Sequence, residues 1–233
     1  MSDLSVSGDQ FNAREYSVSG LVRSGFVRRG ARSFAKEVFD RLFAACALLA
    51  LAPLLLAVAL VILVTDGGPV FFGHERVGRD GRPFRCWKFR TMRRDADTAL
   101  RAVLTRDPVL RAEWEATRKL TDDPRITRVG RFLRRTSLDE LPQFWNVLTG
   151  SMSVVGPRPI VRQELLRFEG HRADYIEMKP GITGMWQVSG RSDTSYEERI
   201  EMDVAYVRAH DLWTDMVIVA RTVRVVLAQA GAR

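Results

Sequence analysis

The feature of this sequence that most constrains its fold is an apolar run of 23 residues, from Leu42 to Val64. The run reads LFAACALLALAPLLLAVALVILV and contains no charged or strongly polar side chain. As a helix rising about 1.5 Å per residue it would be roughly 34 Å long, just sufficient to cross the hydrocarbon core of a bilayer. A core helix of a soluble protein seldom stays apolar on every face for this length, and no small-residue cleavage pattern of a signal peptide follows. The run therefore predicts a membrane helix.

Pro53 and the charge on both flanks weigh against a simple crossing. Pro53 lies at the middle of the run, where it removes a backbone hydrogen bond and kinks a helix. The flanks are both basic: Arg28, Arg29, Arg32, Lys36 and Arg41 precede the run, and Arg76, Arg79, Arg82, Arg85, Lys88, Arg90, Arg93 and Arg94 follow it. Because a crossing segment leaves its positive charge on the cytoplasmic side, this pattern favours a hairpin that enters and leaves one leaflet. A tilted, kinked single crossing stays open on these grounds alone.

The overall charge points to an anionic partner. Lys plus Arg number 36 and Asp plus Glu 28, so the formal net charge is +8. A hydrophobic content of 46% excludes a disordered chain. Two cysteines, Cys46 and Cys86, exclude a disulfide scaffold, and three scattered histidines leave little for a zinc site. A nucleic-acid binder is disfavoured, because the basic residues flank a membrane segment and no nucleic-acid motif is present.

The rest of the chain predicts an α+β fold that is mainly helical. We expect a flexible basic arm over residues 1–32, the membrane-entry and hydrophobic helix over 33–66, and a cytoplasmic catalytic domain over 67–233. Asp80-Gly81 between two strand-like segments predicts a β-hairpin. Residues 94–120 look helical, with Asp107 as an N-cap before Pro108. The tail from about Tyr196 to Gln229 is again helical, and its stripe of Trp213, Val217, Ala220 and Val223 is expected to pack against core or lipid.

A second basic segment has two interpretations. Arg125, Arg128, Arg131, Arg134 and Arg135 alternate with apolar residues between residues 125 and 135. Such a helix suits an anionic lipid surface, but an ordinary helix with one face in the core explains the pattern equally well.

Asp139 and Glu140 form the acidic pair of greatest interest. Ser137 and Glu140 fit the S-x-x-E capping box, which would give Glu140 a purely structural role. In the first turn of a helix, Asp139 would be kept ionised by free N–H groups and the helix dipole. An ionised carboxylate with nearby arginines and Mg²⁺ could perform covalent phosphoryl transfer. The candidate arginines are Arg134 and Arg158, the latter in a Gly-Pro-Arg-Pro segment that is either a rigid phosphate-binding turn or only a rigid turn.

Three longer blocks resemble the bacterial sugar transferases, the monotopic polyprenyl-phosphate phosphoglycosyl transferases. These blocks are KFRTM at 88–92, RRTSLDELPQFWNVLTGSMSVVGPRP at 134–159 and KPGITGMWQVSGR at 179–191. Their order, their spacing and the preceding proline-kinked apolar segment agree with the family over residues 33–230. Without additional N-terminal membrane spans, the chain looks most like the exopolysaccharide-initiating hexose-1-phosphate transferases, including the galactosyl type.

The resemblance implies an activity and a site. Members transfer a sugar-1-phosphate from a UDP-sugar to undecaprenyl phosphate at the cytoplasmic face of the inner membrane and release UMP. Asp139 matches the nucleophile, which also takes part in Mg²⁺ binding, and Glu140 matches the glutamate that assists it. The phosphate-binding arginines match Arg158 and Arg191, while Lys88 and Arg134 match further basic positions. The family's re-entrant helix agrees with the flank charges, and interfacial amphipathic helices accompany it.

One motif departs from the family, and some questions stay open. Lys36-Glu37 stands where many members have Lys-Arg, although Asp40 is present. The expected partners are the UDP-sugar, undecaprenyl phosphate and membrane lipids, with a homodimer left open. No local motif separates galactose from glucose. The competing hypothesis is a non-catalytic, basic, membrane-bound scaffold that holds acidic partners.

Overall fold

The computed structural model describes residues 29–117, 120–189 and 194–227. The first element is helix α1, Arg29–Asp66, and a β-hairpin follows it. The remaining helices and strands, in chain order, are β1 Phe71–Val77, η3 Arg79–Gly81, β2 Pro83–Phe89, α2 Ala96–Arg106, α3 Pro108–Thr117, α4 Arg128–Thr136, η4 Leu138–Glu140, α5 Gln143–Leu148, β3 Ser153–Val155, α6 Arg162–Leu165, η5 Leu166–His171, α7 Arg172–Glu177, β4 Gly181–Thr183, α8 Met185–Val188, α9 Tyr196–Ala209 and α10 Leu212–Leu227. The mainly helical class with a small hairpin is therefore confirmed. The predicted arm falls on residues 1–28, outside the described residues, and on the first turn of α1.

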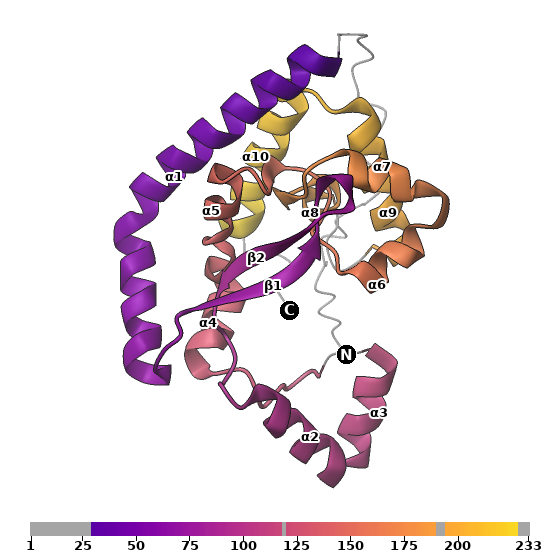
Figure 1. Ribbon diagram of the computed structural model, residues 1–233. Helices are drawn as coiled ribbons and strands as arrows, with labels where there is room; N and C mark the ends of the chain where they lie inside the picture. Colours follow the sequence, from indigo (N-terminus) through magenta and orange to yellow (C-terminus); the bar gives the residue numbers. More distant parts are fainter. Residues whose placement is uncertain (1–28, 118–119, 190–193, 228–233) are drawn as a thin grey trace, which may run out of the picture.

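Helix α1 is long and apolar enough, from Phe34 to Asp66, to cross a membrane. It stays helical through Pro53, and Figure 1 shows that it bends partway along its length instead of folding back on itself. Its outer side carries exposed leucines at intervals of seven residues, at positions 42, 49, 56 and 63. Intervals of seven residues place side chains on one face of a helix, so this face presents a continuous apolar stripe.

Both ends of α1 are attached to the same globular body. Near its beginning, the Lys36 ammonium lies 2.6 Å from the Asp215 carboxylate of α10, and both side chains are buried. Near its end, Ile62 packs against Phe89 of β2. The Arg90 guanidinium donates a hydrogen bond of 3.0 Å to the carbonyl of Asp66, the last residue of the helix. Helix α1 is thus fixed to the globular body at both of its ends.

The predicted hairpin forms around the Asp80-Gly81 pair. Strands β1 and β2 are antiparallel, with Phe71 opposite Phe89 and Val77 opposite Pro83. Asp80 and Gly81 both adopt the left-handed conformation that such a tight turn requires. A second, two-stranded sheet is parallel and joins β3 to β4. These two small sheets carry the segments that flank the site.

The predicted break in the 94–120 region is confirmed. Helix α2 ends at Arg106 and α3 begins at Pro108, while the Asp107 carboxylate accepts hydrogen bonds from the N–H groups of Val109 and Leu110. Figure 1 shows α2 and α3 projecting from the body below the rest of the molecule.

The basic segment at 125–135 forms α4, and one face of this helix packs in the core. Leu133 is only 1% exposed and joins the cluster that contains Ile62 and Phe89, while Phe132 lies outside it and is exposed. The helix begins at Thr127, whose hydroxyl accepts a hydrogen bond from the Gly130 N–H. Position 130 requires glycine because the helix packs directly on the backbone of Thr91: a Cβ at this position would lie 2.0 Å from the Thr91 carbonyl oxygen. An interfacial role for α4 remains a prediction.

The C-terminal tail forms two helices, α9 and α10, which break at His210. Trp213 and Val223 of the predicted stripe are exposed, so they do not pack in the core, and their packing against lipid remains a prediction. The buried face of α10 carries Asp215 and Ile218. Asp215 is buried because Lys36 and the Tyr206 hydroxyl satisfy its carboxylate.

Candidate active site

The acidic pair lies in η4, between the last turn of α4 and the beginning of α5. Ser137 ends α4 in the left-handed conformation, with φ 58°, which turns the chain sharply into η4. The predicted capping box is wrong, because the Ser137 side chain caps nothing and the Glu140 side chain turns toward β2. The αL conformation at Ser137 replaces the extended backbone that an N-cap residue needs. Asp139 is 8% exposed, whereas Glu140 is reached from outside.

Lys88 and Arg134 bring positive charge to this pair. The Lys88 ammonium, on β2, lies 2.5 Å from the nearer Glu140 carboxylate oxygen. The Arg134 guanidinium, in the last turn of α4, donates a hydrogen bond of 2.9 Å to the Thr91 hydroxyl. Of the six residues predicted for the site, the structure thus gathers four: Asp139, Glu140, Lys88 and Arg134. Sequence reasoning missed Thr91, which carries no motif of its own beyond its place in KFRTM.

Asn146 fixes the position of the pair against β2. Its side-chain carbonyl accepts a hydrogen bond from the Trp87 N–H at 2.9 Å, and its amide group donates to the Arg85 carbonyl at 2.7 Å. Asn146 is 3% exposed and belongs to α5, which follows η4 directly. A buried amide that satisfies two backbone groups of one strand sets the register of helix and strand. Asn146 therefore holds Glu140 opposite Lys88.

The electrostatics of the pair differ from the sequence expectation. Burial and, to a smaller extent, the charge of Glu140 raise the pKa of Asp139 to about 6, although Lys88 and Arg134 oppose both. Asp139 lies in a turn of three residues and not in the first turn of a longer helix, and burial there outweighs the stabilisation of its charge that was expected from a helix terminus. Burial by itself would lower the pKa of Lys88, but Glu140 and Asp139 together raise it above the ordinary value. At neutral pH the site holds a desolvated carboxylate beside two fixed cations.

Arg158 belongs to a second cluster. Its backbone is fixed on both sides: the N–H donates to the Asp203 carboxylate at 3.2 Å, and the carbonyl accepts from the Tyr175 hydroxyl at 2.9 Å. The preceding Gly156 packs directly on the 179–181 backbone, where a Cβ would lie 2.5 Å from the Lys179 carbonyl oxygen. The Arg158 guanidinium lies over the Trp186 ring, 5.6 Å from its centroid. This loop is thus rigid and presents a cation.

Arg76 connects the two clusters, and sequence reasoning missed it. Its guanidinium is largely buried and lies 3.6 Å from the Glu164 carboxylate. Burial lowers the pKa of Arg76, and the nearby positive charge of Arg158 lowers it further. Cys86, on the same side of the hairpin, lies near both Arg76 and Lys88. Basic groups therefore extend from the acidic pair to Arg158. Arg191, the remaining predicted residue, lies outside the described residues.

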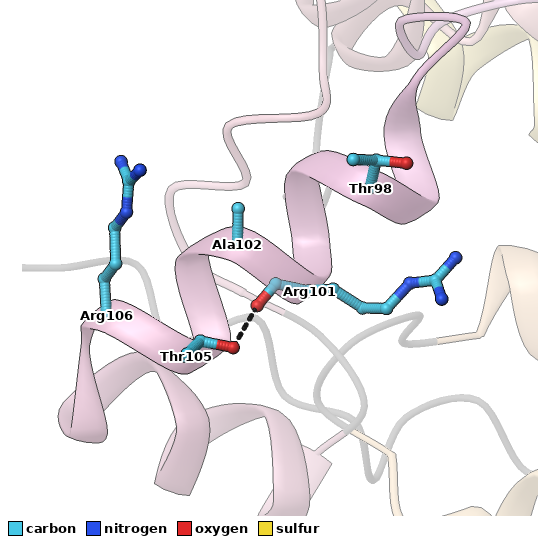
Figure 2. A pocket seen from close by; sticks show the side chains of 5 residues that line it. All are labelled: Thr98, Arg101, Ala102, Thr105 and Arg106. Atoms are coloured by element: carbon cyan, nitrogen blue, oxygen red, sulfur yellow. Dashed lines mark hydrogen bonds between the residues drawn. The ribbon is translucent and has the colours of Figure 1, made fainter.

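A second surface depression lies elsewhere and has no such arrangement. It is open and runs along α2, lined by Thr98, Arg101, Ala102, Thr105 and Arg106. Figure 2 shows Arg101 and Arg106 pointing away from each other, while the Thr105 hydroxyl donates to the Arg101 carbonyl of its own helix at 2.8 Å. A binding site is distinguished by converging polar groups, which this depression lacks, so the Asp139 cluster is the candidate active site.

Comparison with known proteins points to one family. The family model described as "Bacterial sugar transferase" matches residues 31–229. The chain is 52% identical over 200 residues to a UDP-galactose-lipid carrier transferase of Erwinia amylovora, covering 85% of this chain and 42% of that protein. It is 46% identical to the exopolysaccharide production protein ExoY of Sinorhizobium fredii, covering 84% and 87%. It is 42% identical to the UDP-glucose:undecaprenyl-phosphate glucose-1-phosphate transferase of Escherichia coli, covering 83% and 40%. The chain thus spans less than half of the first and third relatives and most of ExoY.

Proposed function

Since the chain belongs to the bacterial sugar transferase family, we propose that it transfers a hexose-1-phosphate from a UDP-sugar to undecaprenyl phosphate and releases UMP. This would be the first membrane step of exopolysaccharide synthesis, at the cytoplasmic face of the inner membrane. The observation that carries the proposal is the buried Asp139, which lies beside Glu140 and two basic side chains. The names of the relatives support galactose and glucose as the candidate sugars.

The first step forms a bond between Asp139 and the sugar phosphate. An oxygen of the ionised Asp139 carboxylate attacks the phosphorus that carries the sugar. The bond from this phosphorus to the oxygen that bridges the two phosphates breaks, and UMP leaves with the electron pair. Lys88 and Arg134 stabilise the charge that develops on the phosphate oxygens. Covalent catalysis of this kind divides one difficult transfer into two easier ones.

The second step releases the product. A phosphate oxygen of undecaprenyl phosphate attacks the same phosphorus, and the bond to Asp139 breaks. The carboxylate is regenerated and the lipid leaves as a diphosphate-linked sugar. Because UMP departs before the lipid reacts, the soluble and the membrane substrate can use one set of cations in turn. Glu140 holds the Lys88 ammonium in place for both steps.

The carboxylates of Asp139 and Glu140 fit a magnesium ion that is shared with substrate phosphates. Among the described residues, no three His, Cys, Asp or Glu side chains gather as a complete metal cage. Mg²⁺ is commonly held by one or two carboxylates together with substrate phosphates, which matches this pair. When bound, the ion would neutralise negative charge on the diphosphate, with Asp139 as the expected ligand.

The attachment of α1 supports a re-entrant arrangement in the membrane. Its beginning is fixed by Lys36 to Asp215 and its end by Arg90, and both partners belong to the globular body. A body with many charged groups cannot lie on both sides of a bilayer, so the exposed leucine stripe is expected to enter and leave the same leaflet.

A topology measurement tests this arrangement. Single cysteines at Ala35 and Glu75, in a background in which both native cysteines are replaced (Cys46→Ala and Cys86→Ala), flank the apolar run on either side. In right-side-out and inverted vesicles, both are expected to react with an impermeant maleimide from the cytoplasmic side only. Labelling of the two positions from opposite sides would establish a crossing helix.

The raised pKa of Asp139 predicts a pH dependence for the first step. Below about pH 6 the carboxylate is protonated, so the rate of UMP release should fall about tenfold per pH unit and level off above the midpoint. Stability has the opposite pH dependence: because the pKa is raised on folding, the stabilising contribution is complete below pH 3.8 and is lost as the pH rises through about 6. The rate of single-turnover UMP release is measured from pH 4.5 to 8 at several Mg²⁺ concentrations. The midpoint of this pH profile is then extrapolated to zero Mg²⁺. A rate that does not change between pH 5 and 7 would contradict this account.

The function itself is tested by substrate-dependent UMP release. The full chain in nanodiscs with undecaprenyl phosphate and Mg²⁺ is incubated with UDP-galactose, UDP-glucose and their N-acetyl derivatives. We expect rapid UMP release with one donor and formation of the lipid-linked sugar. The scaffold hypothesis predicts no UMP with any donor.

A further inference from the structure

We propose that His74 is a further substrate-binding residue of the candidate active site, and that its ring nitrogen Nε2 donates a hydrogen bond to the phosphate of the departing UMP. The proposal rests on the proposed function, because it assigns a contact to one phosphate of the UDP-sugar. His74 lies in the middle of β1, and its side chain is exposed to solvent. The two steps described above give this histidine no role.

The register of the hairpin places His74 on the face that carries Lys88. His74 is directly opposite Cys86, and Cys86 precedes Lys88 by two residues on β2. Residues that are opposite each other, or two apart along a strand, have their side chains on the same face of a sheet. On this face the Lys88 ammonium reaches the Glu140 carboxylate, and the charges of both groups act on the Cys86 thiol. Since Cys86 is buried and His74 is exposed, the face is covered over β2 and open over β1, beside the acidic pair.

The contact with Arg76 fixes the orientation and the tautomer of the His74 ring. The Arg76 guanidinium lies 3.1 Å from Nδ1 of His74. Because a guanidinium can only donate, Nδ1 accepts, and a neutral ring then carries its single proton on Nε2. Partial burial lowers the pKa of His74, and the nearby charges of Arg76 and Lys88 lower it further, which agrees with a neutral ring. Within the part of the chain that the structure describes, the Nε2–H group has no acceptor, so it is available to a ligand.

The position of His74 fits the leaving phosphate of the donor. The register positions of Lys88 and Arg76 are four residues apart along the hairpin, and His74 lies midway, roughly 7 Å from each position along the strand. In the proposed first step, the phosphorus attacked by Asp139 lies beside Lys88, and the phosphate of UMP is joined to it through one oxygen. The leaving group of an in-line displacement points away from the nucleophile. Along β1, His74 is thus the next donor beyond Lys88 on the way to Arg76.

The two ring nitrogens of His74 can be tested separately. In His74→Gln the side-chain amide can donate near the position of Nε2, but no acceptor remains near the position of Nδ1. In His74→Asn the shorter side chain can accept from Arg76 near the position of Nδ1, but it does not reach the position of Nε2. His74→Phe keeps a ring and removes both groups. The matched control is His171→Gln, which replaces another exposed histidine, on η5, and should retain full activity.

The test measures the first turnover of UMP release by the full chain in nanodiscs with Mg²⁺, without undecaprenyl phosphate, using the donor that the assay above identifies. The affinities for UMP and for uridine are measured on the same preparations. His74→Asn and His74→Phe should lower kcat/KM for the donor, and the affinity for UMP, by about ten- to a hundredfold, the range expected for a hydrogen bond to a charged group. His74→Gln should stay within about threefold of the original, because it still donates to the phosphate. The affinity for uridine, which has no phosphate, should not change in any variant.

Each other outcome overturns the inference in a recognisable way. A loss in His74→Gln with full activity in His74→Asn would assign His74 only to the support of Arg76. A normal first turnover in His74→Asn, followed by slow transfer to added undecaprenyl phosphate, would place Nε2 at the phosphate of the lipid instead. Normal rates and affinities in both variants would leave His74 without a role. If the unsubstituted protein released no UMP with any donor, the proposed function would fail and the inference with it, whereas the other three results leave that function intact.

Discussion

Asp139→Asn is expected to lower the rate of UMP release by about a thousandfold or more, because the amide cannot form the bond to phosphorus. The substitution keeps the shape of the side chain and removes a charge that is costly to bury, so the fold should be at least as stable as before. The first turnover, measured without lipid acceptor, isolates the step that the substitution removes. Asp97→Asn, in the projecting helix α2, provides the matched control and should retain full activity. Residual activity within tenfold of the original would exclude Asp139 as the nucleophile.

Lys36→Met is expected to produce the largest loss of stability, about 3–5 kcal/mol, since it leaves the Asp215 carboxylate buried without its cation. Asp215 is 0% exposed, and its remaining partner, the Tyr206 hydroxyl, supplies a hydrogen bond but no charge. The melting temperature in a fixed detergent should fall by roughly 6 °C or more.

Lys179→Met is the matched control for this experiment. Lys179 also pairs with a residue of α1, at 2.8 Å from the Glu37 carboxylate, but this pair is partly exposed and should contribute about 1 kcal/mol or less. Equal shifts for the two lysine variants would contradict the claim that the Lys36–Asp215 pair anchors the membrane helix.

Structural features that depend on residues close together in the sequence were predicted well. The apolar run, the Asp80-Gly81 turn and the Asp107 cap all depend on neighbouring residues, and the structure contains each of them. The family motifs implied that Lys88 and Glu140 belong to one site, and the structure places the two charges together. In these cases the residues that determine the feature are neighbours in the sequence or belong to one family motif, so the sequence alone reveals it.

Features that depend on packing could not be predicted. Ser137 resembles an N-cap in sequence, but the end of α4 places it in the left-handed conformation. Asp203 and Arg76 stand in no motif, and Asn146 has no assigned role within the block at 134–159; only the packing of α9, β1 and α5 brings these residues to the site. Asp215 is buried on α10 because its partner Lys36, 179 residues away in the sequence, neutralises its charge, and no local pattern indicates this pair.

The most direct test of the central claim is intact-protein mass spectrometry after incubation with Mg²⁺ and one UDP-sugar at a time, without undecaprenyl phosphate. With the correct donor, the account predicts a protein that has gained the mass of one hexose phosphate, and peptide mapping that places it on Asp139. The adduct should disappear when undecaprenyl phosphate is added, and Asp139→Asn should never form it. An adduct of equal yield in Asp139→Asn, or one mapped to another residue, would contradict the account.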